Sequence, residues 1–371
     1  MTPAGFRQQF PVLRDRVWLD TSAAAPASLP VLAALRDALD EWEAGDFSWV
    51  EWESIAYATR PMLARMIGAD AGCVALAGSL SQAAATVARS LPAGRIVVGE
   101  REFRSNLFPW LQLRDHGFDV IEVAEPAGVP RTAALLERID PGTTLVAVSE
   151  VLTATGSRID LAAVVERAHD VGARVFVNLT QSLGVLRFDV GAVPADYVAV
   201  HGYKWLLCPR GCAWLYVRPD RLSGLEPLAP SWKSSRDPYR EYFGGPLDYA
   251  PDAARLDASL SQLPWIGARA SLDLLAQQDA AAIERQALDL AHRFRTGADA
   301  LGLRPVPVES ESHIVLLEAG DPHVLATELE RARVVASIRN RRLRVGFHGF
   351  NNTDDVDAAL AAASATGGVR T

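Results

Sequence analysis

The sequence predicts an α/β protein whose large domain holds a mostly parallel sheet of seven strands, with a smaller α+β domain at the C-terminal end. Three observations predict this fold: short apolar runs recur up to Val217, helical patterns separate many of them, and the alternation then stops. Parallel strands need crossover connections, which are usually helices. The seven runs expected to form the sheet are Cys73–Leu76, Arg95–Val98, Val120–Val123, Thr144–Val148, Val175–Val177, Tyr197–Val200 and Ala213–Val217.

Helices and loops are expected between and after these runs. Leu161–Val171 has apolar residues at helical spacing, and Gly172 follows it, as glycine often follows a helix C-terminus. Residues 231–246 combine turn residues with aromatic and basic side chains, which predicts a loop. A long helical stretch over Pro264–Leu301 then leads to the C-terminal α+β unit. We therefore expect a large domain at residues 17–260 and a small domain that consists of residues 261–371 together with residues 1–16.

The composition excludes several classes of protein. The 371 residues are enough for two domains, and a net charge of −8 argues against a nucleic-acid partner. No apolar run approaches the roughly 18 to 20 residues of a membrane helix, and residues 1–16 lack the apolar core of a signal peptide. The cysteines Cys73, Cys208 and Cys212 are too few and too irregularly spaced for a disulfide framework or a zinc site. We expect a cytoplasmic protein with no metal ion and no membrane partner.

Lys204 is the most informative residue of the chain. It stands on a short turn with His201 and Tyr203, between two runs expected to be strands. A desolvated lysine at the mouth of a site has a lowered pKa and becomes a nucleophile towards carbonyl groups, as in the Schiff-base lysines of pyridoxal phosphate enzymes. Most lysines between strands are solvated, so this interpretation depends on the surrounding residues.

Polar residues follow the strand expected at Val175–Val177. In open parallel sheets, ligands bind outside the carboxyl ends of the strands. Asn178, Thr180 and Gln181 are therefore placed where a cofactor ring could lie.

Five further segments, taken in order along the chain, carry a resemblance to a known family. They are Trp18–Pro26, Ala77–Ala83, Glu102–Trp110, Ser149–Gly156 and Arg344–Val356. With the Lys204 turn, they resemble the class V aminotransferase group of fold-type I pyridoxal phosphate enzymes, which includes cysteine desulfurases, kynureninase and isopenicillin N epimerase. The resemblance runs from about Trp18 to the C-terminus and implies the fold-type I architecture.

The resemblance implies that Lys204 forms the Schiff base with pyridoxal 5′-phosphate. The other implied contacts are with the cofactor ring, its phosphate, its pyridine nitrogen and its phenolic oxygen. The resemblance assigns Phe103 to the ring and Asn178 to the pyridine nitrogen. It assigns Thr153 and Gln181 to the phenolic oxygen. The phosphate contacts that it implies are Ser79, Leu80, His201 and Tyr203.

Two of these assignments have a simpler alternative. Ser79 stands at an apparent helix start, where a serine is commonly only an N-cap although the helix N-terminus also suits a phosphate. A buried phenylalanine such as Phe103 is usually a core residue.

The substrate side is implied in the same way. Arg344 is expected to bind the α-carboxylate, because a guanidinium group matches a carboxylate with two parallel hydrogen bonds. Alternation along a strand separates Arg342 and Arg344 from Arg341. Ala23 and Ala24 lie in the small-residue loop that the family places beside the substrate.

The chain departs from the family at three places. The family normally has a carboxylate where this chain has Asn178, and an amide does not hold a proton on the pyridine nitrogen, which disfavours transamination. No cysteine follows Cys212, so a desulfurase that carries a persulfide is not expected. Ala258–Gln262 lacks the Gly-Thr signature that the neighbouring subunit contributes to the phosphate site in the family.

An aromatic group offers the one indication of the substrate. Glu41–Glu53 contains three tryptophans and a phenylalanine, which pack in the core or a dimer interface or else border the site. With Trp232, Tyr239 and Tyr242 they could form an aromatic wall for a large substrate.

The sequence thus predicts a homodimeric pyridoxal phosphate enzyme that acts on the Cα or Cβ bonds of an amino acid. We favour β-elimination, such as C–S cleavage of a cysteine conjugate in a specialised pathway. An epimerase, an aminotransferase and a decarboxylating oxidative deaminase remain open as alternatives, as does a pyridoxal phosphate-binding protein without catalytic activity.

Overall fold

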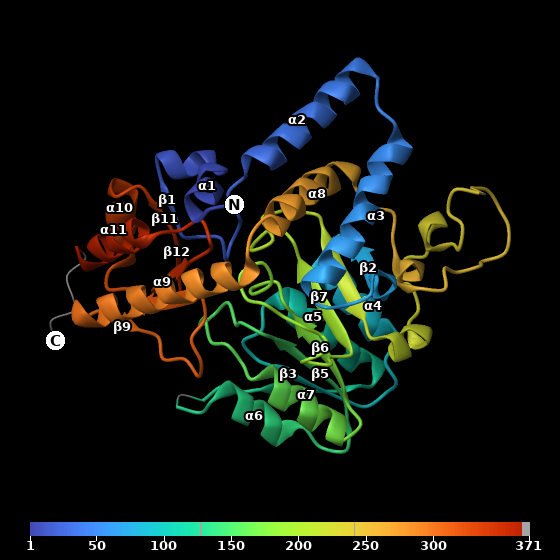
Figure 1. Ribbon diagram of the computed structural model, residues 1–371. Helices are drawn as coiled ribbons and strands as arrows, with labels where there is room; N and C mark the ends of the chain where they lie inside the picture. Colours follow the sequence, from blue (N-terminus) through green and yellow to red (C-terminus); the bar gives the residue numbers. More distant parts are fainter. Residues whose placement is uncertain (127, 241, 366–371) are drawn as a thin grey trace.

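The computed structural model describes residues 1–126, 128–240 and 242–365. A seven-stranded sheet forms the centre of the larger part (Figure 1). Its strands lie in the order β2-β8-β7-β6-β5-β3-β4. Their bounds are β2 (Val74–Ala77), β3 (Arg95–Gly99), β4 (Asp119–Val123), β5 (Thr143–Ser149), β6 (Arg174–Asn178), β7 (Tyr197–His201) and β8 (Ala213–Val217). The seven strands expected from the sequence are all present, within two residues at each end.

The sheet is mostly parallel, as predicted. β4, β3, β5, β6 and β7 run in one direction, and β8 is antiparallel to both of its neighbours, β2 and β7. Ser149 at the end of β5 is in register with Asn178 at the end of β6, and Asn178 is in register with Ala199 of β7. The polar residues that end these strands therefore meet at one edge of the sheet.

Alternate residues of the central strands point into two different cores. In β5 and β6, Val146 and Val177 belong to one apolar cluster, whereas Ala147 and Phe176 belong to the other. A strand buried on both faces has no polar alternation, which explains the continuous apolar runs in the sequence. Helices α4 (Leu80–Arg89) and α5 (Arg104–Leu111) cover one face; α3 (Trp49–Met66), α6 (Arg131–Arg138), α7 (Leu161–Asp170) and α8 (Gln262–Ala276) cover the other.

The helix expected at Leu161–Val171 is α7. Its N-cap is Asp160, whose carboxylate accepts a hydrogen bond from the backbone N–H of Ala163 at 3.0 Å. Gly172 follows the C-cap with a φ of +80°, a conformation that glycine adopts without strain.

The prediction of one long helical stretch over Pro264–Leu301 was wrong. The chain forms two helices there, α8 and α9 (Ala280–Ala300). The carboxylate of Asp279 accepts from the backbone N–H groups of Ala281 and Ala282, at 2.9 and 3.3 Å, and so starts a second helix. Helix α8 packs between α2 (Leu29–Ala44) and α3, whereas α9 lies with the C-terminal elements (Figure 1).

The C-terminal unit is an antiparallel sheet with helices, as expected. Its strands lie in the order β12-β13-β10-β9, and a separate parallel pair joins β1 near the N-terminus to β11. The bounds are β1 (Val17–Trp18), β9 (Arg304–Pro305), β10 (Ile314–Glu318), β11 (Val334–Val335), β12 (Ser337–Arg339) and β13 (Arg342–Gly346), with helices α1 (Pro3–Gln8), α10 (Pro322–Arg331) and α11 (Thr353–Ser364).

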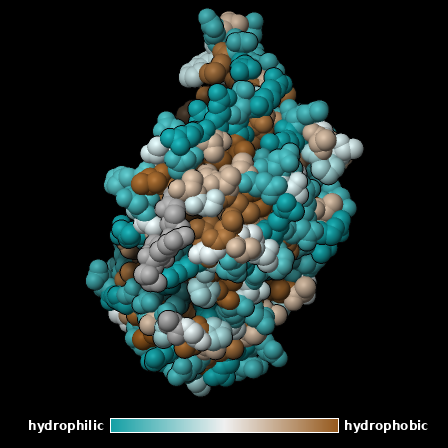
Figure 2. Space-filling model, turned by 90° about the vertical axis from the view of Figure 1, so that its left-hand side faces the viewer, coloured by the Kyte–Doolittle hydropathy of each residue, from teal (hydrophilic) through white to brown (hydrophobic). Residues whose placement is uncertain are grey.

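The face of the molecule over this unit is mainly hydrophilic, with hydrophobic side chains gathered near its middle (Figure 2). Surface helices present such a polar face when their apolar stripe is buried against a sheet. Within the described ranges, no helix is long and apolar enough to cross a bilayer. The division at residue 260 stays a prediction.

Candidate functional site

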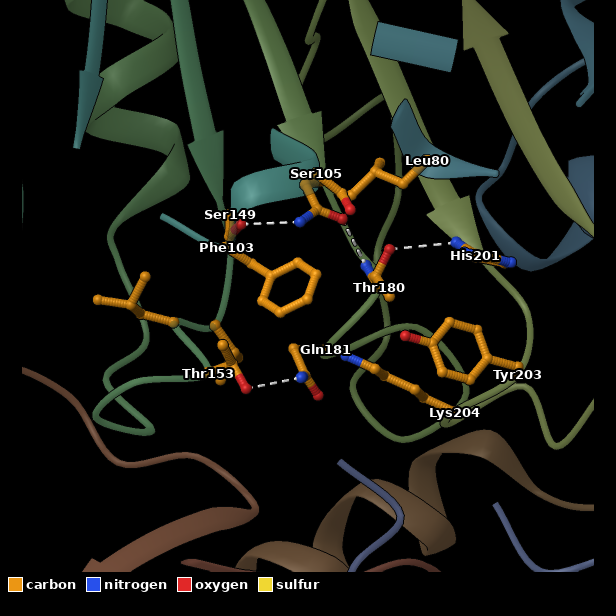
Figure 3. Close-up of a pocket in the computed structure, with 13 residues that line it drawn as sticks. Leu80, Phe103, Ser105, Ser149, Thr153, Thr180, Gln181, His201, Tyr203 and Lys204 are labelled. Carbon is orange, nitrogen blue, oxygen red and sulfur yellow. Dashed lines mark hydrogen bonds between the residues drawn. The ribbon is translucent and has the colours of Figure 1, made fainter. Parts of the chain in front are cut away.

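A cavity opens at the edge of the large sheet where β5, β6 and β7 end. The starts of α4 and α5 close it from the other side (Figure 3). Its lining residues are Leu80, Phe103, Ser105, Ser149, Val151, Leu152, Thr153, Asn178, Thr180, Gln181, His201, Tyr203 and Lys204. Nine of the residues that the sequence predicted for the site therefore meet in one cavity.

Lys204 is buried in this cavity, with 5% of its surface exposed. Its Nζ lies 5.4 Å from the ring centroids of both Phe103 and Tyr203 (Figure 3). Burial, with a smaller contribution from the positive charges of Arg344 and Arg210, lowers the pKa of Lys204 to about 7. Near neutral pH a substantial fraction of the side chain is therefore an uncharged, nucleophilic amine.

The turn that carries Lys204 is held by a close approach of two backbones. Gly184, with a φ of +106°, lies so near Trp205 that a Cβ atom would stand 2.2 Å from the Trp205 carbonyl oxygen. The fully buried Trp205 indole donates to Gln181 Oε1 at 2.8 Å. The lysine turn is thus fixed against the segment that follows β6.

The end of the cavity near α4 has the polar groups of an anion site. Ser79 is the N-cap of α4, and its Oγ accepts from the backbone N–H of Gln82 at 3.2 Å. Its neighbour Leu80 lines the cavity, whereas Ser79 itself is not among the lining residues. Ser79 is therefore observed only as the N-cap of α4. Its contact with a phosphate stays a prediction.

His201 adds an unpartnered polar atom to this end. Its Nε2 is buried and has no hydrogen-bond partner. Burial lowers the pKa of His201 to about 4, with Arg210 and Lys204 contributing, so the ring is neutral at pH 7. Its ring packs edge to face against Tyr203, with the centroids 4.5 Å apart. A buried ring nitrogen without a partner suits a hydrogen bond to a ligand.

Phe103 projects into the cavity rather than into the core. Its side chain is 48% exposed, and it lies between the ends of β5 and β6 on the side opposite Tyr203 (Figure 3). The alternative of an ordinary core phenylalanine is therefore wrong. A flat ring at this position is available to stack on an aromatic ligand.

Asn178 is 4% exposed, and both polar atoms of its side-chain amide form hydrogen bonds. Its Nδ2 donates to Ser149 Oγ at 2.8 Å, and its Oδ1 accepts from the backbone N–H of Thr180 at 3.0 Å. Thr180 Oγ1 in turn accepts from the backbone N–H of His201 at 3.1 Å (Figure 3). The strand ends of the sheet are thus joined by one set of hydrogen bonds.

Arg344, on β13, does not line the cavity itself but contacts the lining residue Thr153. Its Nη1 donates to Thr153 Oγ1 at 2.7 Å, and its Nη2 lies 3.4 Å from Asp20 Oδ1. Its Nε is buried and has no partner. Burial lowers the pKa of Arg344, while Asp20 opposes this effect.

Thr153 also accepts from Gln181 Nε2 at 2.9 Å (Figure 3). With Arg344 donating as well, the hydroxyl hydrogen of Thr153 is left to donate elsewhere.

The small-residue loop lies beside the lysine turn but outside the cavity lining. Ala23 and Ala24 donate their N–H groups to the Asp20 carbonyl oxygen, and Ala25 N–H donates to the Tyr203 carbonyl oxygen at 3.0 Å. Neither Ala23 nor Ala24 lines the cavity, and their contact with substrate stays a prediction.

Sequence reasoning missed several lining residues. Ser149 is the clearest, because it ends β5 in register with Asn178, and the rule that placed Asn178 at the strand end applies equally to it. The others that it did not assign to the site are Ser105, Val151 and Leu152.

The aromatic side chains expected to form a wall do meet, at a different place. The Trp232 ring lies 6.2 Å from Trp49, 5.7 Å from Tyr239 and 5.6 Å from Tyr242. None of these four residues lines the cavity that holds Lys204. Whether they border a substrate stays a prediction.

The cysteines lie away from the cavity, and among the described residues no His, Cys, Asp and Glu side chains are grouped for a metal ion. Cys208 and Cys212 are buried, and burial raises the pKa of Cys208 to about 12 and that of Cys212 further. Cys73 is partly exposed, and burial together with Asp70 and Asp252 raises its pKa.

Comparisons with known proteins agree with this geometry. Residues 17–358 match the family model described as Aminotransferase class-V. Isopenicillin N epimerase from Streptomyces clavuligerus is 29% identical over 354 residues, which cover 87% of each chain. A probable cysteine desulfurase from Methanothermobacter thermautotrophicus is 34% identical over 232 residues, which cover 60% of this chain but only 58% of that protein.

Solved structures share the whole fold. The cystine C–S lyase C-DES, in complex with its product cysteine persulfide, superposes with a TM-score of 0.87 at 20% identity. The match covers 97% of this chain and 100% of that one. At this identity the likeness concerns the fold alone.

Proposed function

Because the chain belongs to the class V aminotransferase family, we propose that it is a pyridoxal phosphate-dependent lyase that breaks the Cβ–S bond of a modified cysteine by β-elimination. The family and the fold class predicted from the sequence are confirmed, and pyridoxal 5′-phosphate is the cofactor of the family. The reaction, the substrate and the place of both in a specialised pathway are the proposal.

The observation that carries the proposal is the buried Lys204 amine. It stands in the cavity at the strand ends with a pKa lowered to about 7, and no carboxylate side chain lines the cavity. An amine in this state attacks a carbonyl carbon and takes up a proton at neutral pH.

The residues present fit the cofactor. Lys204 would attach its aldehyde, Phe103 would stack on its ring, and the unpartnered His201 Nε2 would donate to its phosphate at the N-terminal end of α4. When bound to an amino acid, the cofactor withdraws electrons from the bonds at Cα. Asn178 and Gln181 would contact the ring from β6.

Arg344 would orient the substrate. Its guanidinium lies close enough to Lys204 for its charge to lower the lysine pKa, and its buried Nε has no partner. A substrate carboxylate would satisfy that N–H and offset the like charges of Arg344 and Lys204. Bound in this way, the substrate would have its Cα near the amine.

The chain's own residues can carry the proton balance of the reaction. The free Lys204 amine accepts the proton of Cα, and the electron pair of that C–H bond forms the double bond between Cα and Cβ. The Cβ–S bond breaks, its electron pair leaves on sulfur, and Lys204 returns its proton to the thiolate. No oxidant or reductant is needed, and water converts the unsaturated product to a keto acid and ammonia.

The cysteines argue against sulfur transfer to the protein itself. A persulfide-forming cysteine must be an accessible thiolate. Cys208 and Cys212 are buried thiols with raised pKa values, and none of the three cysteines lines the cavity. A lyase that releases its sulfur product to solvent fits these positions.

Epimerisation at Cα is the second candidate. The relative that covers 87% of this chain is an isopenicillin N epimerase, and the same amine could take the Cα proton in both reactions. The products separate the two: elimination releases a thiol and a keto acid, whereas epimerisation returns the other enantiomer.

We also infer that the chain works as a homodimer. Trp42 and Trp49, at the facing ends of α2 and α3, are 55% and 43% exposed, and large exposed apolar groups are common at interfaces. Sedimentation at micromolar concentration tests this, and a monomer would contradict it.

The chain offers a matched control for the main test, because Lys204 and Lys233 are its two lysines. Lys233 is equally buried but pairs with Glu53 at 2.7 Å, away from the cavity. The protein would be loaded with cofactor, reduced with borohydride and digested. We expect the reduced cofactor on Lys204 alone, and its loss in Lys204→Ala but not in Lys233→Arg.

The same proteins would then be given a panel of S-substituted cysteines. Release of thiol and keto acid by the natural protein and by Lys233→Arg, but not by Lys204→Ala, supports the proposal. Turnover by Lys204→Ala would contradict the assignment of Lys204, and enantiomer exchange without thiol release would establish epimerisation. Cofactor binding without conversion of any substrate in the panel would favour the non-catalytic alternative.

A further inference from the structure

A buried chain of hydrogen bonds lies directly behind the cavity. It begins at Glu102, whose side chain is fully buried in the segment between β3 and α5. Ser149 Oγ donates to Glu102 Oε2 through a short hydrogen bond, and Ser149 Oγ accepts from Asn178 Nδ2 at 2.8 Å. The chain therefore connects a carboxylate outside the cavity lining to the amide that the lining presents.

The Glu102 carboxylate is held by a clamp. Arg131, whose side chain is 4% exposed, donates from Nη2 to Glu102 Oε1 at 2.5 Å and from Nη1 to the Ser149 carbonyl oxygen at 2.8 Å. The backbone N–H of Ser149 donates to Glu102 Oε1 at 2.7 Å, and Asn106 Nδ2 donates to Oε2 at 3.0 Å. A buried charge with this many partners keeps one position.

The partners fix the direction of every hydrogen bond in the chain. A carboxylate paired with Arg131 only accepts, so the Ser149 hydroxyl must donate its hydrogen to Glu102. With its hydrogen on Glu102, Ser149 Oγ can only accept from its other neighbours, so the Asn178 atom that faces it must be the nitrogen. The amide oxygen then faces the N–H of Thr180, which requires an acceptor (Figure 3).

We propose that Glu102 and Ser149 are positioning residues that lock the Asn178 amide in one orientation and so decide which of its two atoms the cofactor's pyridine nitrogen meets. This rests on the proposed function, because it concerns the ring held by Lys204. Asn178 supplies no charge of its own, and an unconstrained amide could turn by 180° and exchange a donor for an acceptor. The hydrogen bonds from Glu102 through Ser149 keep the Asn178 amide in one of these two orientations.

Two substitutions separate the lock from mere packing. Ser149→Ala removes the partner of the amide nitrogen, so that only the Thr180 N–H still holds the amide. Glu102→Gln keeps the shape: its oxygen would stay with Arg131 and the Ser149 N–H, which places its NH₂ group opposite Ser149. The same group would face Asn106, whose amide must then turn its unpartnered oxygen towards it. Ser149 would then accept from the glutamine and point its hydrogen at Asn178, which favours the reversed amide at this end while the Thr180 N–H still favours the present one. Ser149→Thr keeps the hydroxyl and is the conservative rescue.

The test uses holoenzyme loaded with cofactor carrying ¹⁵N in its ring, with the ring nitrogen titrated by NMR. We expect Ser149→Ala and Glu102→Gln to move the titration midpoint by about one pH unit, the size of one hydrogen bond to a charged group, and Ser149→Thr to restore it. Ser182→Ala is the matched control, because Ser182 is fully buried near the same turn but donates to the Leu179 carbonyl oxygen. It should leave the midpoint unchanged.

A second measurement does not need the cofactor. In cofactor-free protein labelled with ¹⁵N-asparagine, the side-chain NH₂ signal of Asn178, assigned through Asn178→Ala, should exchange with water roughly tenfold faster in Ser149→Ala and unchanged in Ser182→Ala. Equal exchange in both variants would overturn the lock even if cofactor binding failed. If cofactor binds to Lys204 but the ring midpoint is the same in all variants, the proposed function stands and the lock is refuted.

Discussion

Replacing Lys204 with methionine should stabilise the cofactor-free protein at low pH. Burial and two neighbouring arginines lower the pKa of Lys204 from 10.5 to about 7. This difference of about 3.5 pH units means that a charged Lys204 costs the fold roughly 5 kcal/mol below pH 7. Contacts of the ammonium with the rings of Phe103 and Tyr203 offset about 1 kcal/mol. We expect Lys204→Met to raise the free energy of unfolding by several kcal/mol at pH 6.

The pH dependence gives this prediction its sign. Between pH 7 and 10.5 the unfolded chain holds a proton that the folded Lys204 has lost, so the natural protein gains stability as the pH rises through this window. Lys204→Met lacks this gain, and its advantage should shrink by roughly 3 kcal/mol from pH 6 to pH 9.

Urea unfolding of both proteins at the two pH values measures the effect. Lys233→Met is the control, because it removes the ion pair with Glu53 and should destabilise the protein at both pH values. An advantage of Lys204→Met that does not change with pH, or a loss of stability at pH 6, would refute the reasoning.

Three further predictions concern activity. Arg344→Ala should raise KM about 10- to 100-fold for substrates with an α-carboxylate, as loss of a charged hydrogen bond does, and much less for amines without one; equal effects in steady-state assays would make Arg344 structural. Treatment of the folded protein with iodoacetamide should leave activity intact, because Cys208 and Cys212 are buried thiols with raised pKa values; inactivation that tracks their modification by mass would contradict a lyase without a catalytic thiol. Asn178→Asp should raise the pKa of the ring nitrogen and convert cofactor to its aminated form over repeated turnovers, which chromatography of the released cofactor measures. A complete amino-acid and keto-acid exchange cycle in the natural protein would instead favour the aminotransferase.

The strands were predictable because each is buried on both faces, and a continuous apolar run then marks it in the sequence. The same strands placed Asn178 and Gln181, which follow β6, at the cavity. Their partners were harder to predict. Glu102 lies 47 residues before Ser149 in the chain, and only the order of β3 and β5 in the sheet brings the two into contact.

The sequence contains a local signal for the break between α8 and α9, but the apolar pattern around it indicates the opposite. Asp279 followed by alanines is a helix start, yet the apolar spacing on both sides of it predicts one continuous helix. Trp232 and Tyr242 were correctly associated with Trp49, because the loop from residue 231 packs on the start of α3. Their position away from the cavity depends on how that loop folds back, which composition does not specify.

The distribution of charge is the strongest argument for a short-lived carbanion in the reaction. On the substrate side the positive charges of Lys204, Arg344 and Arg210 outnumber the negative charge of Asp20, so a carboxylate and a departing thiolate would be stabilised there. Among the described residues, no carboxylate side chain lines the cavity near Asn178, and Glu102, which is paired with Arg131, is connected to that end through the Ser149 hydroxyl. A ring nitrogen facing an amide withdraws electrons less strongly than a protonated one. Such a site favours reactions in which the electrons at Cα move on at once, as they do when the bond to sulfur breaks.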